Sequence, residues 1–296
     1  MKRWMVVIVL LLMTTSTSAW WPRGHGILTR AAIETLPNDF PAFIKAGVGM
    51  VAHASVDPDV AKNRATTSLE KAGHPIHYFN AELVAGKTLP ISRYEFERLC
   101  AEGNQKVEQV GLLPYATAEA TDQLTLAFAE YRKWPEHPYI QAKCLLYAGI
   151  VAHFAQELCQ PLNLTIYWNG RGEDGKPKNT RIHENIDGLI QNMDLKPSVI
   201  AADLKPEAAD SLMGAIVGQL TESRKHIDQA LALDKYVSPK DADYKNEADV
   251  QKFAIQQARE AARFTAVLYL TAWEKSASVR LPGWIDRGDM DHFGRQ

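Results

Sequence analysis

The sequence predicts an all-α protein, and three observations support that fold class. Apolar residues recur at intervals of three and four over most of the chain, which is the period of an amphipathic helix. Runs that alternate apolar and polar residues are too short to build a sheet. No internal repeat or low-complexity linker interrupts the helical segments. We therefore expect residues 20–296 to form a single compact multi-helix domain.

The helical segments can be placed in order along the chain. Residues 27–36 show helical periodicity before Pro37, and residues 43–51 follow Pro41, a residue type favoured in the first turn of a helix. Ser92 and Glu95 have the capping-box spacing and open a helix that we expect to reach Val110. The remaining expected helices cover residues 116–131, 139–158, 206–233 and 250–275. Two long loops, residues 55–80 and the Gly-rich residues 162–181, lie between them.

The composition limits the classes of function. With 46% hydrophobic and 23% charged residues, the chain is globular rather than disordered. A formal net charge of -2 argues against loose polyanion binding, which draws on an excess of Lys and Arg. The charge count does not exclude a metal enzyme, because bound cations supply positive charge that a residue count omits.

The first 19 residues have the pattern of a secretory signal peptide. Lys2 and Arg3 precede the apolar residues 5–13, and small polar residues lead to Ala19. A run of about nine apolar residues is too short to span a bilayer. The alternative is a buried N-terminal helix or a lipid anchor, but no cysteine for lipid attachment follows. We expect cleavage after Ala19, which makes the protein secreted or periplasmic, with Trp20 as its new N-terminus.

The three cysteines, Cys100, Cys144 and Cys159, fit no disulfide framework. In an oxidising compartment two of them could pair and leave one thiol, and the sequence does not decide which two.

Histidines and carboxylates recur with metal-ligand spacing. His153 and Glu157 are four residues apart on an expected helix, so both project from one face, and His183 and Asp187 repeat that spacing. His25, Asp57, Asp59, His74 and His77 are further ligand types in the first part of the chain. A single such pair is more often a salt bridge, but the whole series predicts a zinc centre with His and carboxylate ligands.

These segments resemble the family of zinc-dependent phospholipases C and single-strand-specific nucleases. Trp20 and His25 match the Trp-x4-His start of the nuclease branch, and the segment from His153 to Asn163 is similar to the family's His-x3-Asp core. Asp59, the segment His77-Tyr78-Phe79-Asn80 and the pair His183–Asp187 match other family segments, so the resemblance covers residues 20–187. It implies an exported, all-helical hydrolase with two to three zinc ions.

The resemblance also implies ligand roles. One zinc would be held by Asp59, rather than Asp57, with His77, His153 and Glu157. A second would be held by the amine and carbonyl of Trp20, with His25 and a bridging Glu157. The pair would hold a hydroxide for attack on phosphorus, and Asp59, the expected catalytic residue, would orient it or accept its proton. An α-amino group titrates near neutrality, so it loses its proton to a metal at little cost.

Two positions depart from the family pattern. Glu157 stands where the family has an aspartate, and Asn163 stands where it has a histidine. An amide oxygen is a weak zinc ligand. The third site therefore has His183 and Asp187 with one doubtful member, Asn163, and water, His74 or substrate would have to complete it.

The sequence leaves three functions open. We favour a nuclease or nucleotidase acting on single-stranded DNA or RNA, because of the Trp20–His25 spacing, with Tyr78 stacking a base and Asn80 reading its edge. Lys62 would contact the phosphate, or be a solvated loop lysine. The alternatives are a phospholipase C, with Trp168 and Trp284 as an apolar rim, and a non-catalytic zinc-binding protein. No obligate protein partner is expected.

Overall fold

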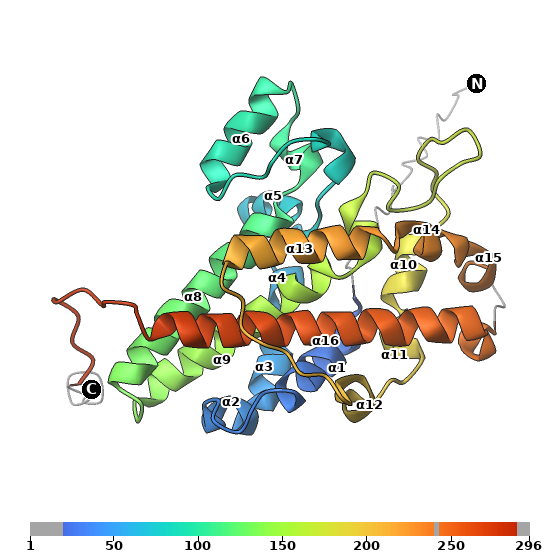
Figure 1. Cartoon of the computed structure of the whole chain (residues 1–296). Coiled ribbons are helices and arrows are strands. Elements are labelled where there is room, and N and C mark those ends of the chain that lie inside the picture. Colours follow the sequence, from blue (N-terminus) through green and yellow to red (C-terminus); the bar gives the residue numbers. More distant parts are fainter. Residues whose placement is uncertain (1–19, 240–242, 289–296) are drawn as a thin grey trace, which may run out of the picture.

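The computed structural model describes residues 20–239 and 243–288, and in these ranges it is built of helices (Figure 1). The β-structure in the same ranges is one isolated bridge between Arg171 and Pro177. The all-α prediction is confirmed. The expected signal peptide and His292 lie outside the described residues. None of the described helices is long and apolar enough to cross a membrane.

Three long helices form the frame of the molecule. Helices α8 (Leu113–Lys133) and α9 (Pro138–Leu158) are joined by a short turn, and α16 (Ala248–Ser276) packs against both (Figure 1). Each of α8 and α9 has a proline in its first turn, where the missing N–H costs no hydrogen bond. The helices predicted at 116–131, 139–158 and 250–275 agree with α8, α9 and α16 to within three residues at each end.

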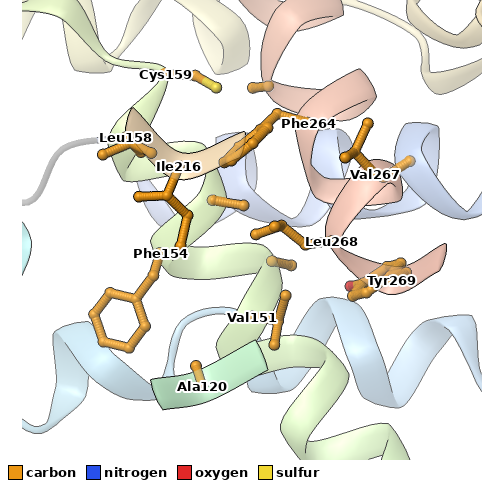
Figure 2. Close-up of a cluster of buried hydrophobic side chains, with 14 of the residues drawn as sticks. Ala120, Val151, Phe154, Leu158, Cys159, Ile216, Phe264, Val267, Leu268 and Tyr269 are labelled. Carbon is orange, nitrogen blue, oxygen red and sulfur yellow. The ribbon is translucent and has the colours of Figure 1, made fainter. Parts of the chain in front are cut away.

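The core lies where α16 meets α9. Phe264, Leu268 and Tyr269 of α16 belong to one buried cluster with Val151 and Leu158 of α9 (Figure 2). The Tyr269 hydroxyl donates a hydrogen bond to the Ala148 carbonyl at 2.7 Å, so the ring is fixed at its polar end as well. Burying a side chain of this size contributes about 1.5–3 kcal/mol, and the contact holds the last turns of α9 in place.

Helix α1 (Pro22–Glu34) lies beside α3 (Val48–Ala54) and also contacts α9, α12 (Pro197–Ala201) and α16. Helix α3 crosses α9 closely at Gly149, where an added Cβ would lie 2.5 Å from the Ala54 Cβ and 2.8 Å from the Val51 carbonyl oxygen. A side chain at this position would push the helices apart. The glycine therefore allows α3 to lie close against α9.

Three predicted helices are interrupted. The segment 43–51 forms α2 (Ala42–Ala46) and α3, which meet at Gly47. The segment from 92 forms α6 (Arg93–Glu102) and α7 (Val107–Val110), separated at Gly103 and Asn104, and Asn104 has φ 54°. The Ser92 side chain makes no capping hydrogen bond. The segment 206–233 forms α13 (Leu212–Arg224) and α14 (Ile227–Ala232).

The predicted loops contain short helices, and these carry several of the expected ligands. The loop 55–80 holds α4 (Asp57–Val60), α5 (Thr67–Gly73) and the 3-10 helix η1 (Pro75–His77). The other short elements are η2 (Ala81–Val84), η3 (Pro161–Leu164), α10 (Ile182–Asp187), α11 (Leu189–Asn192), α15 (Asp234–Val237) and η4 (Tyr244–Asn246).

The three cysteines are buried and unpaired, so the structure has no disulfide among them. Cys144 and Cys159 lie at the two ends of an α9 segment about 22 Å long at 1.5 Å per residue. Sulfurs bridge across a Cα separation of at most about 7 Å. This geometry excludes a Cys144–Cys159 disulfide, and Cys100 is unpaired as well.

Candidate metal centre

Five of the predicted ligands meet at the end of α9. His153 and Glu157 lie on one face of its last turns, His25 comes from α1, Asp59 from α4 and His77 from η1. Ligand atoms of His25, Asp59, His153 and Glu157 all lie within 4.8 Å of one another. All five side chains are largely buried, and those of His25, His153 and Glu157 have no exposed area. Their meeting depends on the close packing of α1 and α3 against α9.

The spacing inside the cluster fits ligands around a small metal ion. The Glu157 Oε1 atom lies 3.4 Å from His25 Nε2 and 3.3 Å from His153 Nε2. The Asp59 carboxylate lies 3.5 Å from His77 Nε2 and 4.0 Å from His25 Nε2. Zinc binds nitrogen and oxygen at about 2.0–2.2 Å, and the edge of such a tetrahedron is about 3.3–3.6 Å. The three pairs at 3.3–3.5 Å are too far apart for good hydrogen bonds and at the right distance to share a zinc ion, whereas the Asp59–His25 pair at 4.0 Å is wider than one tetrahedron edge.

The three imidazoles are held from their outer side. His77 Nδ1 donates to the Gly73 carbonyl at 2.5 Å, and His153 Nδ1 donates to the Ser55 carbonyl at 2.9 Å. A carbonyl accepts a proton and cannot donate one, so both rings carry their hydrogen on Nδ1. Their Nε2 atoms, which face the cluster, are buried without a hydrogen-bond partner. This is the arrangement by which proteins orient histidine ligands toward a metal.

His25 is held in the same way by Gln156. Its Nδ1 atom lies 2.6 Å from Gln156 Oε1, and Gln156 Nε2 donates to Thr29 Oγ1 at 3.0 Å. The hydrogen bond to Thr29 turns the Gln156 oxygen toward His25, so His25 Nε2 also faces the cluster without a partner. Sequence reasoning missed Gln156, although it stands beside Glu157, because its role depends on the position of α1.

Burial sets the charges of the cluster. It lowers the pKa of His77 to about 3, and the positive charge of Lys62 acts in the same direction. It also lowers the pKa of His153, so both rings are neutral at neutral pH, as metal ligands must be. Burial raises the pKa of Glu157. Burial opposes ionisation of Asp59 too, but nearby positive charge, including that of Lys62, outweighs it and holds the pKa of that carboxyl below its usual range.

Asp59 and Lys62 form a buried pair. The Lys62 Nζ atom lies 2.6 Å from Asp59 Oδ1, and Lys62 is 4% exposed. The reading of Lys62 as a solvated loop lysine is therefore wrong. Asp57, on the same short helix, is exposed, so Asp59 is the aspartate that joins the cluster. The position of Lys62 fits the predicted phosphate contact, which itself stays a prediction.

Trp20 is fully buried at the start of α1, and its indole Nε1 donates to the Gln156 carbonyl at 3.0 Å. The next residue, Trp21, donates its backbone N–H to the Asp187 carbonyl at 3.2 Å. The ligand role of the Trp20 amine stays a prediction.

A cavity of about 510 Å³ opens beside the cluster. Its walls include Lys62, His77 and Glu157 on the inner side, and Tyr78, Asn80 and Trp168 among the others. The Tyr78 hydroxyl donates to the Glu108 carbonyl, and Asn80 Nδ2 donates to the Gln109 carbonyl at 2.7 Å. Both predicted substrate contacts therefore line the cavity, but these donors hold the backbone of α7. Sequence reasoning missed the α7 wall, because the helix break before it was not predicted.

The three residues expected at a third site also lie together. Asn163 Oδ1 is 2.8 Å from His183 Nε2, and His183 Nε2 is 3.7 Å from Asp187 Oδ1. Gln160 Nε2 donates to Asp187 Oδ1 at 2.6 Å. His74, the alternative member, lines the same cavity and lies 3.5 Å from Glu70.

The other histidines lie outside the cluster. His53 is exposed on α3 and His137 is buried at the start of α9. His226, partly exposed, lies 3.3 Å from Gln256. None of these three histidines belongs to the group of ligand atoms at the metal centre.

No protein-family model matches the chain, and no curated protein matches it either. Among solved structures, the fold is similar to the alpha-toxin from Clostridium absonum, with a TM-score of 0.44 and 12% identity over 89% of this chain and 68% of that one. It is also similar to the alpha-toxin of Clostridium perfringens from the avian strain SWCP, with a TM-score of 0.41 and 12% identity over 86% of this chain and 64% of that one. The chain thus spans about two thirds of the length of these toxins.

A likeness of this size does not define a shared activity. The fold and the cluster themselves define an all-α protein with a buried histidine and carboxylate centre of the kind that holds zinc.

Proposed function

We propose that this protein is an exported zinc-dependent hydrolase of phosphodiesters. The observation that carries the proposal is the set of three buried Nε2 atoms and Glu157 Oε1, which face one another without hydrogen-bond partners, beside the buried Asp59–Lys62 pair and an open cavity. Unpartnered polar atoms cost free energy in a folded protein, so a cluster of them at zinc-ligand spacing implies a bound ion.

The chain's own residues divide the chemistry between them. His25, His77, His153, Glu157 and Asp59 would hold the zinc ions. When bound, zinc supplies Lewis acidity toward the phosphoryl oxygens. Asp59 stands at the edge of the cluster, where its carboxylate can orient an attacking water and accept its proton. Lys62 places a buried positive charge where negative charge develops on the phosphoryl group.

The walls of the cavity favour a substrate with a single phosphodiester and an apolar part. Lys62 is the one lysine or arginine among the described residues that line the cavity, and Glu108 adds a negative charge. Grooves that follow a nucleic-acid strand are lined by several positive charges. Leu83, Leu162 and the 39% exposed Trp168 give the cavity an apolar side. We therefore infer a phospholipid headgroup as the first substrate to test.

Nucleic acid is the second candidate, and Tyr78 is the observation that favours it. Its ring lines the cavity and is fixed by the hydroxyl bond to α7, so it offers a rigid surface for one base. This arrangement suits a mononucleotide or a strand end better than a long strand. The preference for a nuclease that the Trp20–His25 spacing suggested has no support from the similar structures.

Of the two tryptophans predicted to form an apolar rim, Trp168 lines the cavity and Trp284 does not. Trp284 is 82% exposed, but it belongs to the C-terminal segment in which Arg287 lies 3.4 Å from Glu130, near the turn between α8 and α9 (Figure 1). His153 lies about 22 Å further along α9 at 1.5 Å per residue. Trp284 is therefore too far away to border the cavity.

The proposal is tested with zinc-loaded protein that begins at Trp20. We expect hydrolysis of bis(p-nitrophenyl) phosphate and release of a phosphorylated headgroup from phosphatidylcholine vesicles. Single-stranded DNA and RNA are assayed in parallel. Cleavage of nucleic acid without lipid turnover would make nucleic acid the first candidate substrate. Full zinc loading with no turnover of any substrate would leave the non-catalytic zinc-binding alternative.

A further inference from the structure

Asn163 occupies the position between the metal centre and His183. It is buried, and it belongs to η3, the short helix that follows α9. Its Nδ2 atom donates to Glu157 Oε2 at 2.5 Å and to the Glu157 carbonyl at 3.2 Å. Its Oδ1 atom accepts from His183 Nε2 at 2.8 Å. The amide therefore uses both its donor group and its acceptor to join Glu157 to His183.

Interatomic distances show that the contacts of Asn163 differ in kind from those within the metal centre. Facing atoms in the centre lie 3.3–4.0 Å apart and lack hydrogen bonds. Asn163 Oδ1 and His183 Nε2 lie 2.8 Å apart, which is the length of a hydrogen bond and too short for the edge of a zinc tetrahedron. Since an amide oxygen only accepts, the hydrogen lies on His183 Nε2, and that nitrogen has no lone pair for a metal.

The other polar atoms of the third site do not make up for the loss of His183 Nε2 as a ligand. His183 Nδ1 and Asp187 Oδ2 are buried without hydrogen-bond partners. Within the described residues, however, the one group of three or more His, Cys, Asp or Glu ligand atoms is the centre of His25, Asp59, His153 and Glu157. Two protein donors fall short of the three that a catalytic zinc site has and of the four that a structural zinc site has.

We propose that this protein is a two-zinc enzyme in which the hydrogen-bonded chain Glu157–Asn163–His183 takes the place of a third metal. The inference rests on the proposed function. Glu157 Oε2 is held by Asn163, so Oε1 alone faces the ions. His183 becomes a wall of the cavity, with the Trp168 ring at 5.6 Å, and is a positioning residue rather than a ligand.

The first test counts zinc in the purified protein that begins at Trp20. After saturation and removal of excess metal, elemental analysis is expected to give two zinc ions per chain. His183→Ala should keep two, whereas His153→Ala should lose at least one. Three ions in the wild-type protein, or a loss of zinc in His183→Ala, would overturn the inference and leave the hydrolase proposal standing. Protein that binds no zinc would overturn both.

The second test asks whether Asn163 is the reason that a third zinc ion does not bind. Asn163→His restores a nitrogen ligand and is expected to raise the count from two zinc ions to three. A count that stays at two in folded Asn163→His would overturn the assignment to Asn163.

The third test uses the wild-type chain, so it does not depend on a variant that folds. Long-range ¹H–¹⁵N spectra should show His183 with its hydrogen on Nε2, both before and after zinc is added. His25, His77 and His153 should carry it on Nδ1, and their Nε2 signals should shift with zinc. A zinc-dependent shift of a His183 ring nitrogen would contradict the two-zinc centre.

Discussion

Lys62 Nζ lies 2.6 Å from Asp59 Oδ1, and both side chains are almost completely buried. The pair couples the metal centre to the cavity, because Asp59 faces the imidazoles while Lys62 lines the cavity wall. A buried pair of this kind is expensive to break, since removal of one partner leaves the other charge uncompensated.

Removing the Lys62 charge should lower turnover more than zinc content. A charged hydrogen bond to a transition state is worth about 1.5–3 kcal/mol, so Lys62→Met should reduce kcat/KM by about 10- to 150-fold. Lys62→Arg should recover part of the loss. Lys71→Met, at an exposed position nearby, is the control. Kinetics with bis(p-nitrophenyl) phosphate and elemental analysis measure the two effects, and equal rates in Lys62→Met and the control would contradict the phosphate role.

Asp59→Asn should affect both metal binding and catalysis. An amide is a poor zinc ligand, so we expect the loss of at least one zinc ion and a fall in kcat of at least about 1,000-fold. The matched control is Asp57→Asn, which changes an exposed carboxylate on the same short helix and should keep both properties. Similar losses in both variants would mean that Asp59 acts through the fold of α4 rather than as a ligand.

An extension before Trp20 should weaken the centre. If the free amine of Trp20 binds zinc, protein with a Gly-Ser extension should hold less zinc and hydrolyse substrate more slowly than protein that begins at Trp20. An extension turns the Trp20 amine into a peptide amide, whose nitrogen has no free lone pair for zinc. Circular dichroism serves as the check on folding, and equal zinc content in the two forms would refute the amine as a ligand.

His183 should make the stability of zinc-free protein depend on pH. Burial lowers the pKa of His183 to about 3, so its contribution is present above pH 6.5 and is lost as the pH falls below that value. Relative to His183→Gln, the wild-type protein should lose about 2 kcal/mol of unfolding free energy between pH 7.5 and pH 5.0. Urea unfolding at the two pH values measures the difference. A constant difference would show that the ring titrates normally.

Gly149→Ala should destabilise the fold. The added Cβ would lie 2.5 Å from the Ala54 Cβ, so overpacking should reduce the unfolding free energy by about 1–3 kcal/mol. Gly218→Ala is the control, because a Cβ at that helical position meets no atom within 4 Å. It should leave stability unchanged or raise it by up to about 1 kcal/mol. If Gly149→Ala folds normally, its zinc affinity should still fall, since α1 and α3 are displaced from α9.

The sequence predicts those parts of the centre that depend on local spacing. His153 and Glu157 face the same way because they are four residues apart on a helix, and this follows from helix geometry alone. The meeting of His25 with Glu157 depends instead on how α1 packs, which the resemblance to a family suggested and periodicity did not. The break at Gly103 and Asn104 was missed because the predicted helix continued to Val110, past two residue types that often end helices. Asn163 was recognised as a departure, but its contact with Glu157 depends on side-chain orientation.

The hydrogen bonds outside the imidazoles have a consequence for metal choice. The carbonyls of Ser55 and Gly73 and the side chain of Gln156 hold the three rings by hydrogen bonds that do not involve an ion. An incoming ion therefore meets ligands at fixed angles and distances rather than a flexible set that adapts to it. Such a frame selects by coordination geometry, so four-coordinate ions should be retained in preference to magnesium and calcium, which require six or more oxygen ligands.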